Sequence, residues 1–472
     1  MTEEFVLMTH GAGISPTGMI REAITSRHDR ALATLLARTS HSWKMALDRA
    51  DVVCAPPTGP GGAHVNLFLR RGCGAIATDL DGVPLIDFCM GDGSLLLGHD
   101  HPEIRDALLA QITTGWQFGL PTEMQLVFAR LIQSARPANE RIALCADGSD
   151  ATLFAIRAAR AATGKDGIGV FAGSRHGTHD YGLVSGEPQA SHGLTRNIHL
   201  GAGIPRLIDE IASVLPYGHP AAFDLIRRQR NDLAAVIVEP VRAEDPHLDA
   251  GPWLWELASV CRKAGVLLIF DELTAGFRLA YGGTQEVFGI EPDLTAYGKV
   301  VGGGLPLGVV AGRTEFMRAF GRDILAQGIS AAEANAGNAL AVAAGTAFLS
   351  YANANQESLY PGLQRSTARL SDAFNAAAAA LDVPAALKHA GSVFRITLGS
   401  PRPRNLPAAA QYAAMDAFAI AALNGGVLLK PGLQGFVSAA HTDTQIDQAA
   451  EVFATTLADV KADGFFAALK HR

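Results

Sequence analysis

The sequence is poor in the features that mark disulfide-rich, zinc-binding and membrane proteins. Its five cysteines are scattered, and none forms a Cys-x-x-Cys pair: Cys54, Cys73, Cys89, Cys145 and Cys261. Buried free thiols are therefore expected, with neither a disulfide framework nor a metal site. No apolar run approaches the ~18 residues that cross a bilayer, so no membrane span is expected. The opening MTEEFVLMTH lacks a basic stretch followed by an apolar one. We therefore expect no signal peptide and a cytoplasmic protein.

Positive charge is also scarce. Lysine and arginine total 39 against 46 aspartate and glutamate, for a net charge of −7. That balance argues against a nucleic-acid-binding surface, which needs clustered lysine and arginine. The hydrophobic share of 48% is typical of a globular protein. At 472 residues the chain exceeds the ~100–200 of a usual domain, so two or three lobes are expected.

The periodicity of apolar residues predicts an α/β protein. Residues 20–55 have helical spacing, GAIATDLDGVPLIDF predicts a hairpin turning at Asp81-Gly82, and HPEIRDALLAQI opens a helix. Between about 140 and 315, the apolar runs ERIALCA, GIGVFA, LAAVIVEPV, GVLLIFDE and LGVVAG alternate with helical runs. This alternation predicts a mostly parallel sheet covered on both faces. Beyond about 330, alanine-rich helices and short strands predict an α+β lobe.

A glycine-rich segment, LTAYGKVVGGGLPLGVVAG, surrounds Lys299. Its apolar, uncrowded surroundings favour a desolvated lysine, which can be a free amine that attacks an aldehyde. An ordinary loop lysine that reaches solvent is the alternative. A Walker A lysine is not indicated, because Val300 stands where serine or threonine is required.

Two further motifs carry polar groups at the ends of predicted strands. GVLLIFDELTAGFR runs directly into Asp271 and Glu272, and a carboxylate there can keep a pyridine nitrogen protonated. A metal-site acid is the alternative, although no P-loop accompanies it. ALCADGSDATLF turns at Gly148 and Ser149 into a helix, whose free N–H groups favour a phosphate. Simple helix capping is the alternative there. The three motifs together are the parts that pyridoxal phosphate (PLP) needs.

The ordered blocks GHDHPEI, GSDATLFAIRAARAATGK, RHGTHD, VIVEPV, LLIFDELTAGFR, PDLTAYGKVVGGGLPLG, GNALAVAAG and GFVSAAHT resemble the class III (ω-type) aminotransferases of PLP fold type I. Within them, the chain is most similar to the glutamate-1-semialdehyde 2,1-aminomutase-like branch. The resemblance covers about residues 56 to 345 and returns near 425–450. It implies that Lys299 forms a Schiff base with PLP, Asp271 pairs with the pyridine nitrogen, and Leu273 packs on the ring. Gly148 and Ser149 would hold the phosphate.

Other positions match the family less closely. The resemblance places His176 against the ring face and Glu244 near the phenolic oxygen of the cofactor. Arg175 replaces the aromatic residue that stacks on the ring, and a planar guanidinium can also stack. Ala334 replaces the phosphate-binding threonine expected from the partner subunit, and Ser330 is a candidate substitute.

The expected substrate contacts differ from those of the aminomutase branch. Phe68 stands where that branch carries an arginine for the substrate carboxylate, and Leu433 stands where it carries a glutamate. These differences predict a bulky or apolar substrate. Arg278 could meet a carboxylate or form a structural ion pair.

The sequence therefore predicts a PLP-dependent aminotransferase that moves an amino group from an amine or amino acid to a keto acid or aldehyde. An aminomutase or racemase acting on one substrate is an alternative, and so is a degenerate, non-catalytic PLP-binding protein. The resemblance implies a homodimer with shared active sites. We expect an N-terminal segment at 1–95 that joins the small domain. A large PLP-binding α/β domain with a mostly parallel seven-stranded sheet follows at 96–335, and a C-terminal α+β domain at 336–472.

Overall fold

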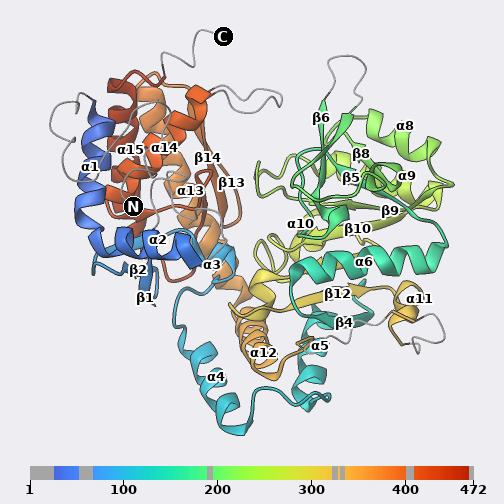
Figure 1. The fold of residues 1–472 in the computed structure, drawn as a ribbon. Helices are drawn as coiled ribbons and strands as arrows, with labels where there is room; N and C mark the ends of the chain where they lie inside the picture. Colours follow the sequence, from blue (N-terminus) through green and yellow to red (C-terminus); the bar gives the residue numbers. More distant parts are fainter. Residues whose placement is uncertain are drawn as a thin grey trace.

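The computed structural model describes residues 26–52, 67–188, 195–321, 328–329, 335–399 and 409–466. Two lobes lie side by side in Figure 1. One contains a large sheet with its covering helices, and the other contains the first and last helices of the described chain. Helices α4 (Pro102–Thr114), α5 (Glu123–Ala135) and α12 (Ala339–Ala354) lie below and between them. No helix among these described residues is long and apolar enough to cross a membrane.

The large sheet has seven strands in the order β4-β12-β11-β10-β9-β5-β8. Their bounds are β4 Arg141–Cys145, β12 Gly308–Gly312, β11 Leu294–Tyr297, β10 Leu267–Glu272, β9 Leu233–Val238, β5 Gly167–Phe171 and β8 Ala212–Leu215. Only β12 runs antiparallel to its neighbours in this sheet. This order confirms the predicted mostly parallel, seven-stranded fold.

Both faces of the sheet are covered, which explains why its strands are continuous apolar runs. Every residue of β9 and β10 is buried. Alternate side chains enter different cores: Ile269 packs on the side of α6 (Gly148–Thr163), whereas Leu268 and Phe270 pack on the side of α9 (Gly251–Ala264). Because successive side chains of a strand point to opposite faces of the sheet, each strand contributes to two separate cores. Helix α9 ends at Gly265 in the left-handed conformation, as its sequence predicts.

The other lobe joins segments from both ends of the chain. Its four-stranded sheet has the order β1 (Leu69–Cys73), β2 (Ile76–Asp79), β3 (Pro84–Asp87) and β15 (Val427–Leu428), with β15 parallel to β3. The predicted hairpin turn lies between β2 and β3, where Gly82 has a φ of 86°. A second sheet contains β13 (Ala385–Ala390), β14 (Val393–Leu398) and β16 (Gln434–Phe436). Helices α1 (Arg27–Arg38), α2 (Ser40–Val52), α13 (Gln356–Ala380), α14 (Ala409–Asn424) and α15 (Asp443–Ala462) complete the lobe.

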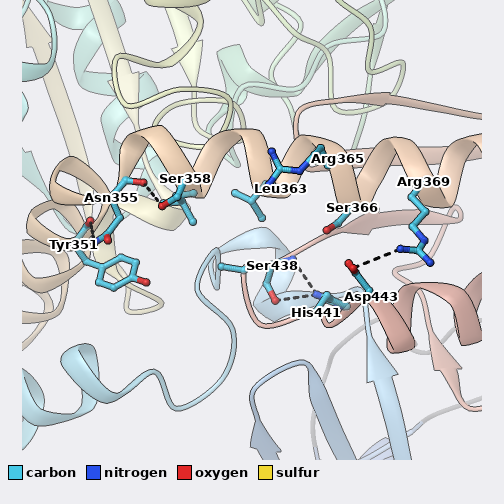
Figure 2. A pocket seen from close by; sticks show the side chains of 13 residues that line it. Tyr351, Asn355, Ser358, Leu363, Arg365, Ser366, Arg369, Ser438, His441 and Asp443 are labelled. Atoms are coloured by element: carbon cyan, nitrogen blue, oxygen red, sulfur yellow. Dashed lines mark hydrogen bonds and ion pairs between the residues drawn. The ribbon is translucent and has the colours of Figure 1, made fainter.

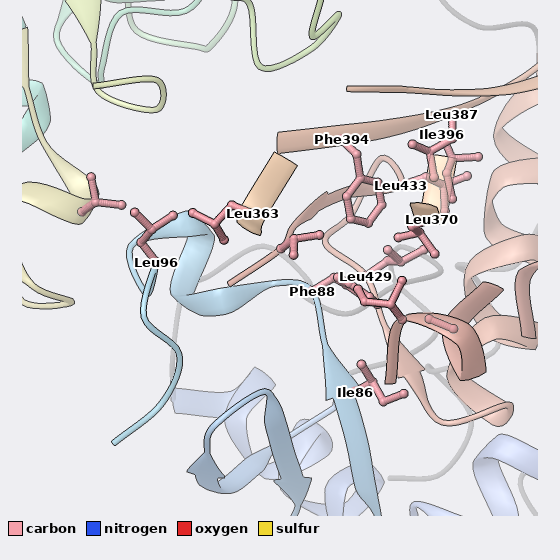
Figure 3. Close-up of a cluster of buried hydrophobic side chains, with 14 of the residues drawn as sticks. Ile86, Phe88, Leu96, Leu363, Leu370, Leu387, Phe394, Ile396, Leu429 and Leu433 are labelled. Atoms are coloured by element: carbon pink, nitrogen blue, oxygen red, sulfur yellow. The ribbon is translucent and has the colours of Figure 1, made fainter. Parts of the chain in front are cut away.

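One hydrophobic core links these two small sheets to the helices (Figure 3). Phe88 and Phe394 meet edge to face, with their ring centroids 5.3 Å apart. Leu433 lies in the same core and is 1% exposed. The segments near 88, 394 and 433 are thus packed as one unit, and the proposed domain division at residues 95 and 335 stays a prediction.

The remaining elements are short: α3 (Met90–Gly93), β6 (Val184–Pro188), β7 (Thr195–His199), α7 (Ile208–Ile211), α8 (Ala221–Arg228), α10 (Gly283–Phe288) and α11 (Thr314–Met317). The four described cysteines are free thiols. Cys145 and Cys261 are buried as expected, whereas Cys89 is half-buried and Cys73 is exposed, and Cys54 lies outside the described residues.

Candidate active site

Three loops meet at one edge of the large sheet. Gly148 follows β4, Leu273 follows β10, and Gly298 follows β11, so each lies at the carboxyl end of a parallel strand. A Cβ atom on Gly298 would lie 3.2 Å from the Cα of Gly148 and 2.9 Å from Cδ2 of Leu273. A Cβ atom on Gly148 would lie 2.8 Å from that same Leu273 carbon. Glycine at both positions therefore lets the start of α6 approach the segment that carries Lys299. This edge is where open α/β sheets bind ligands.

Asp271 and His176 form a buried pair at this edge. Nδ1 of His176 lies 2.7 Å from Oδ2 of Asp271, and the side chains are 1% and 3% exposed. The backbone N–H of Leu273 donates to Oδ1 of Asp271 over 3.0 Å. Nε2 of His176 is buried without a hydrogen-bond partner among the described residues. Such an atom indicates a binding partner that completes the site.

The neighbouring carboxylates have different environments. Glu272, next to Asp271, is fully buried, and its oxygens accept the backbone N–H groups of Thr284 and Gln285. Its role is therefore to hold the start of α10. Glu239 follows β9 at the binding edge, where burial and the nearby Asp271 charge raise the pKa of its carboxyl. Glu239 was not predicted, although the sequence VIVEP repeats the strand-then-carboxylate pattern that singled out Asp271.

Lys299 lies directly after β11 and has a φ of 50°, a left-handed conformation that only a few per cent of non-glycine residues adopt. Its Nζ lies 3.2 Å from Oδ2 of Asp92 and 5.7 Å from the ring centroid of Phe436. Burial lowers the pKa of the Lys299 amine; the Asp92 carboxylate opposes this shift and the Lys430 cation adds to it. The environment therefore favours the free amine that nucleophilic attack requires.

Asp92 contacts two lysines through its two oxygens. Oδ2 contacts Lys299, and Oδ1 forms an ion pair with Lys430. Burial alone would raise the pKa of the Asp92 carboxyl, but the two ammonium groups lower it, so the carboxylate stays ionised. Neither Asp92 nor Lys430 was predicted as a site residue, because nothing in the local sequence places these distant segments together.

Arg278 is fully engaged by the protein. Its Nε donates to the carbonyl of Thr274 and its Nη1 to Oγ of Ser392, each over 3.1 Å, and its Nη2 donates to the carbonyl of Gly93. The guanidinium carbon lies 5.0 Å from the ring centroid of Phe436, and the residue is 1% exposed. Burial lowers the pKa of Arg278 to about 9. These contacts hold the turn that carries Asp92, and they do not form the ion pair that was the alternative expectation.

The structure separates some of the other predicted residues. Ser149 begins α6 beside Gly177, whose added Cβ would lie 2.9 Å from the Cα of Ser149. Arg175 is exposed next to the buried His176. Glu244 forms an ion pair with Arg395 of β14.

The two positions expected to define substrate preference lie in different surroundings. Phe68 is half-buried, and its backbone N–H donates to Oγ of Ser42 over 3.3 Å. Leu433 is buried in the core of the small lobe, where its side chain packs among other apolar groups. The predictions for Ala334 and Ser330 fall outside the described residues.

A separate cavity of about 410 Å³ lies between α13 and the turn before α15 (Figure 2). None of the residues predicted for the site lines it. Its Arg369 is paired with Asp443 and Asp447, at 3.5 and 2.6 Å. Burial lowers the pKa of its His441 to about 4, so that imidazole is neutral near pH 7. The cavity is therefore polar, and its lining includes a second cation, Arg365.

Comparison with known proteins decides the family. The model of the class III aminotransferases matches residues 58–457. The chain belongs to this family. A glutamate-1-semialdehyde 2,1-aminomutase of Methanocorpusculum labreanum is 36% identical over 392 residues, which cover 82% of this chain and 92% of that protein.

Two solved structures resemble the class III chain closely in fold. An omega-transaminase from Sphaerobacter thermophilus has a TM-score of 0.79 and 27% identity, covering 94% of this chain and 100% of that one. A transaminase with PLP bound has a TM-score of 0.80 and 27% identity, covering 90% of this chain and 99% of that one.

Membership of the class III family confirms PLP as the cofactor, and the residues present fit it. The Lys299 amine, the buried Asp271 carboxylate and the start of α6 lie at one edge of the sheet. Asp147 caps α6 by accepting the Asp150 N–H over 3.0 Å, whereas the N–H groups of Gly148 and Ser149 have no acceptor within the helix, which suits a phosphate. The unpartnered Nε2 of His176 is a further polar group available to a ligand.

Proposed function

We propose that this class III, PLP-dependent enzyme is an aminotransferase. The observation that carries amino-group chemistry is the position of Lys299, which follows Gly298 where that residue approaches the start of α6, and whose amine is desolvated. When bound, PLP supplies a carbonyl carbon for the amino group and a ring that withdraws electrons from the substrate carbon. Lys299 would hold PLP as a Schiff base, Asp271 would keep the ring nitrogen protonated, and Gly148 and Ser149 would bind the phosphate.

The protein residues then divide the acid–base work. Lys299, when not bonded to the cofactor, would take the proton from the substrate carbon with its free amine and later return it. Burial of Lys299 suits this task, because a lowered pKa increases the share of free amine that can accept a proton. The Asp271–His176 contact fixes the orientation of the carboxylate.

Transfer between two substrates is favoured by the expected substrate contacts. Phe68 replaces the arginine, and Leu433 replaces the glutamate, that the resemblance assigns to the aminomutase branch. Leu433 is buried in the small-lobe core, so its side chain is not open to a substrate, and the replacement at Phe68 is the one that bears on the donor or acceptor. An apolar donor or acceptor agrees with that replacement. The similar omega-transaminase fold supports the same proposal.

A second candidate is an aminomutase, which moves the amino group within one substrate. The name of the 36% identical relative favours it. Glutamate-1-semialdehyde is then the first substrate to test, because that name specifies it.

The visible spectrum of the holoenzyme separates the two candidates. We expect amine donors to bleach the cofactor band and a keto acid to restore it, with no keto product formed unless a donor is present. Conversion of glutamate-1-semialdehyde without any acceptor would instead identify an aminomutase. Lys299→Ala is the control that should bind PLP without the Schiff-base band. A wild-type protein that stays colourless after PLP addition would refute the assignment of Lys299.

We further propose that the enzyme is a homodimer. Large apolar side chains are exposed on α4, α5 and the segment between them, including Leu109, Ile112, Trp116, Leu120 and Leu126. Exposed apolar side chains concentrated on neighbouring segments of the chain are typical of a protein interface. Sedimentation should give twice the chain mass, and Trp116→Glu with Leu120→Glu should shift the protein towards the monomer. The same substitutions leaving a dimer intact would place the interface elsewhere.

A further inference from the structure

The carboxylate of Asp92 occupies the space between two ammonium groups in the candidate active site. One is the reactive Lys299, 3.2 Å away, and the other is Lys430, which lies between β15 and β16. The Lys430 backbone is fixed by a tight turn, because its N–H donates to the carbonyl of Gln434 and its carbonyl accepts the N–H of Leu433. The Lys430 side chain is 34% exposed, so it is reachable from solvent.

Asp92 is presented by an uncommon backbone turn. Met90, Gly91, Asp92 and Gly93 have φ values of 44°, 58°, 57° and 81°, so four consecutive residues are left-handed. Such a conformation costs about 1–3 kcal/mol for each non-glycine residue and persists only where surrounding contacts enforce it. Asp87 accepts the Met90 N–H from one side, and Arg278 donates to the Gly93 carbonyl from the other.

Formation of the Schiff base changes this charge balance. The Lys299 nitrogen would then no longer be a free partner of Asp92, and Lys430 would remain as the other cation on this carboxylate. Arg278 cannot replace Lys299 without giving up its contacts to Thr274, Ser392 and Gly93. Lys430 is therefore a reachable cation that shares a carboxylate with the reactive amine, and the half-exposed Asp92 carboxylate is its exchangeable partner.

We propose that Lys430 binds the carboxylate of the amino donor, and that Asp92 holds Lys430 in place until this carboxylate displaces it. The inference rests on the proposed function, because it assumes that the donor amine takes the position of the Lys299 nitrogen. The two lysine nitrogens now contact opposite oxygens of a single carboxylate. A donor whose carboxylate lies one or two carbons from its amine spans a similar distance. The preferred donors are thus α- or β-amino carboxylates, with the remainder of the molecule apolar.

Paired donors that differ only in the carboxylate test the proposal on the holoenzyme. The pairs are alanine against ethylamine and 3-aminobutanoate against isopropylamine, each followed as the bleaching of the cofactor band in the absence of an acceptor. Lys430→Met should weaken the half-saturation of amino carboxylates about 10- to 100-fold more than that of the paired plain amines, which is the usual effect of losing one charge-assisted hydrogen bond. Lys430→Arg should restore most of the loss.

Direct binding of butanoate, which has no amine, gives a readout independent of turnover. Isothermal calorimetry on the holoenzyme should show binding that Lys430→Met weakens and Asp92→Asn tightens, because the competing carboxylate is gone. Lys388→Met is the matched control, since Lys388 of β13 forms an ion pair with Asp245 at 2.9 Å outside the candidate site. That control should change neither measurement.

The possible failures are distinguishable. If Lys430→Met weakens plain amines and amino carboxylates equally, or leaves butanoate binding unchanged, the role of Lys430 is refuted while aminotransferase activity stands. If no donor bleaches the wild-type cofactor, the proposed function fails, and the butanoate measurement still decides whether Lys430 binds carboxylates.

Discussion

Replacing Arg278 by methionine should loosen the turn at residues 90–93 without unfolding the small lobe. Three hydrogen bonds from a charged donor would be lost, which together contribute roughly 5–9 kcal/mol. The same substitution removes the cost of keeping a cation buried. Lowering the pKa of Arg278 from 12.5 to about 9 corresponds to a cost of roughly 5 kcal/mol. The difference predicts a net loss of about 2 kcal/mol, much smaller than the number of lost bonds suggests.

Hydrogen exchange measured by mass spectrometry can detect this local loss. Exchange of the peptide covering residues 88–97 should become roughly 30-fold faster in the Arg278→Met holoenzyme, because a 2 kcal/mol change in opening free energy corresponds to that factor. Arg227→Met is the matched control, since Arg227 pairs with Asp224 on the surface of α8 and should leave this peptide unchanged. Unchanged exchange at 88–97 would refute the view that Arg278 holds the turn. A decrease in opening free energy near the full value of three hydrogen bonds would show that burying the Arg278 charge costs little.

The remaining predictions concern the Lys299 amine and the start of α6. Asp92→Asn should move the pH midpoint of PLP incorporation by the apoprotein to lower pH, because the Asp92 charge raises the pKa of Lys299; Lys430→Met should move it to higher pH, because that cation lowers it. The Lys299→Ala variant measures the PLP that other lysines bind. Shifts of the same sign in Asp92→Asn and Lys430→Met would contradict the electrostatic account. Gly148→Ala should weaken PLP affinity, measured by absorbance titration, because the new Cβ would lie 2.8 Å from Leu273. Adding Leu273→Ala should recover part of this affinity, and no recovery would mean that the clash lies elsewhere.

Much of the fold was predictable because its strongest signals are local. Five of the seven large-sheet strands are apolar runs bounded by glycine, proline or charged residues, and each was predicted. The four-residue strands β8 and β11 were missed, since such short segments carry no clear periodicity. The β11 strand lies within LTAY, immediately before Gly298 and Lys299, where the glycine-rich pattern dominates the sequence.

The candidate site was predictable to the extent that its residues follow strands of the large sheet. Asp271, Gly148 and Lys299 do so, and the structure brings their loops together. Asp92 and Lys430 follow short strands of the small lobe instead, and their contact with Lys299 depends on how that lobe packs against the edge of the large sheet. The ion pair between Glu244 and Arg395 was unpredictable for the same reason, because a partner on β14 cannot be inferred from the segment that follows β9.

The parallel pairing of β15 with β3 also sets the order in which the protein can be completed during synthesis. β3 leaves the ribosome before the large sheet has been made, and its partner at Val427–Leu428 emerges only after that sheet is finished. The large lobe can therefore fold first, while the hairpin of β2 and β3 still has one unpaired edge. Lys430 follows β15 by two residues, so the substrate end of the site is assembled at nearly the last step. A nascent chain interrupted before that point would carry the reactive lysine without the contacts that restrain it.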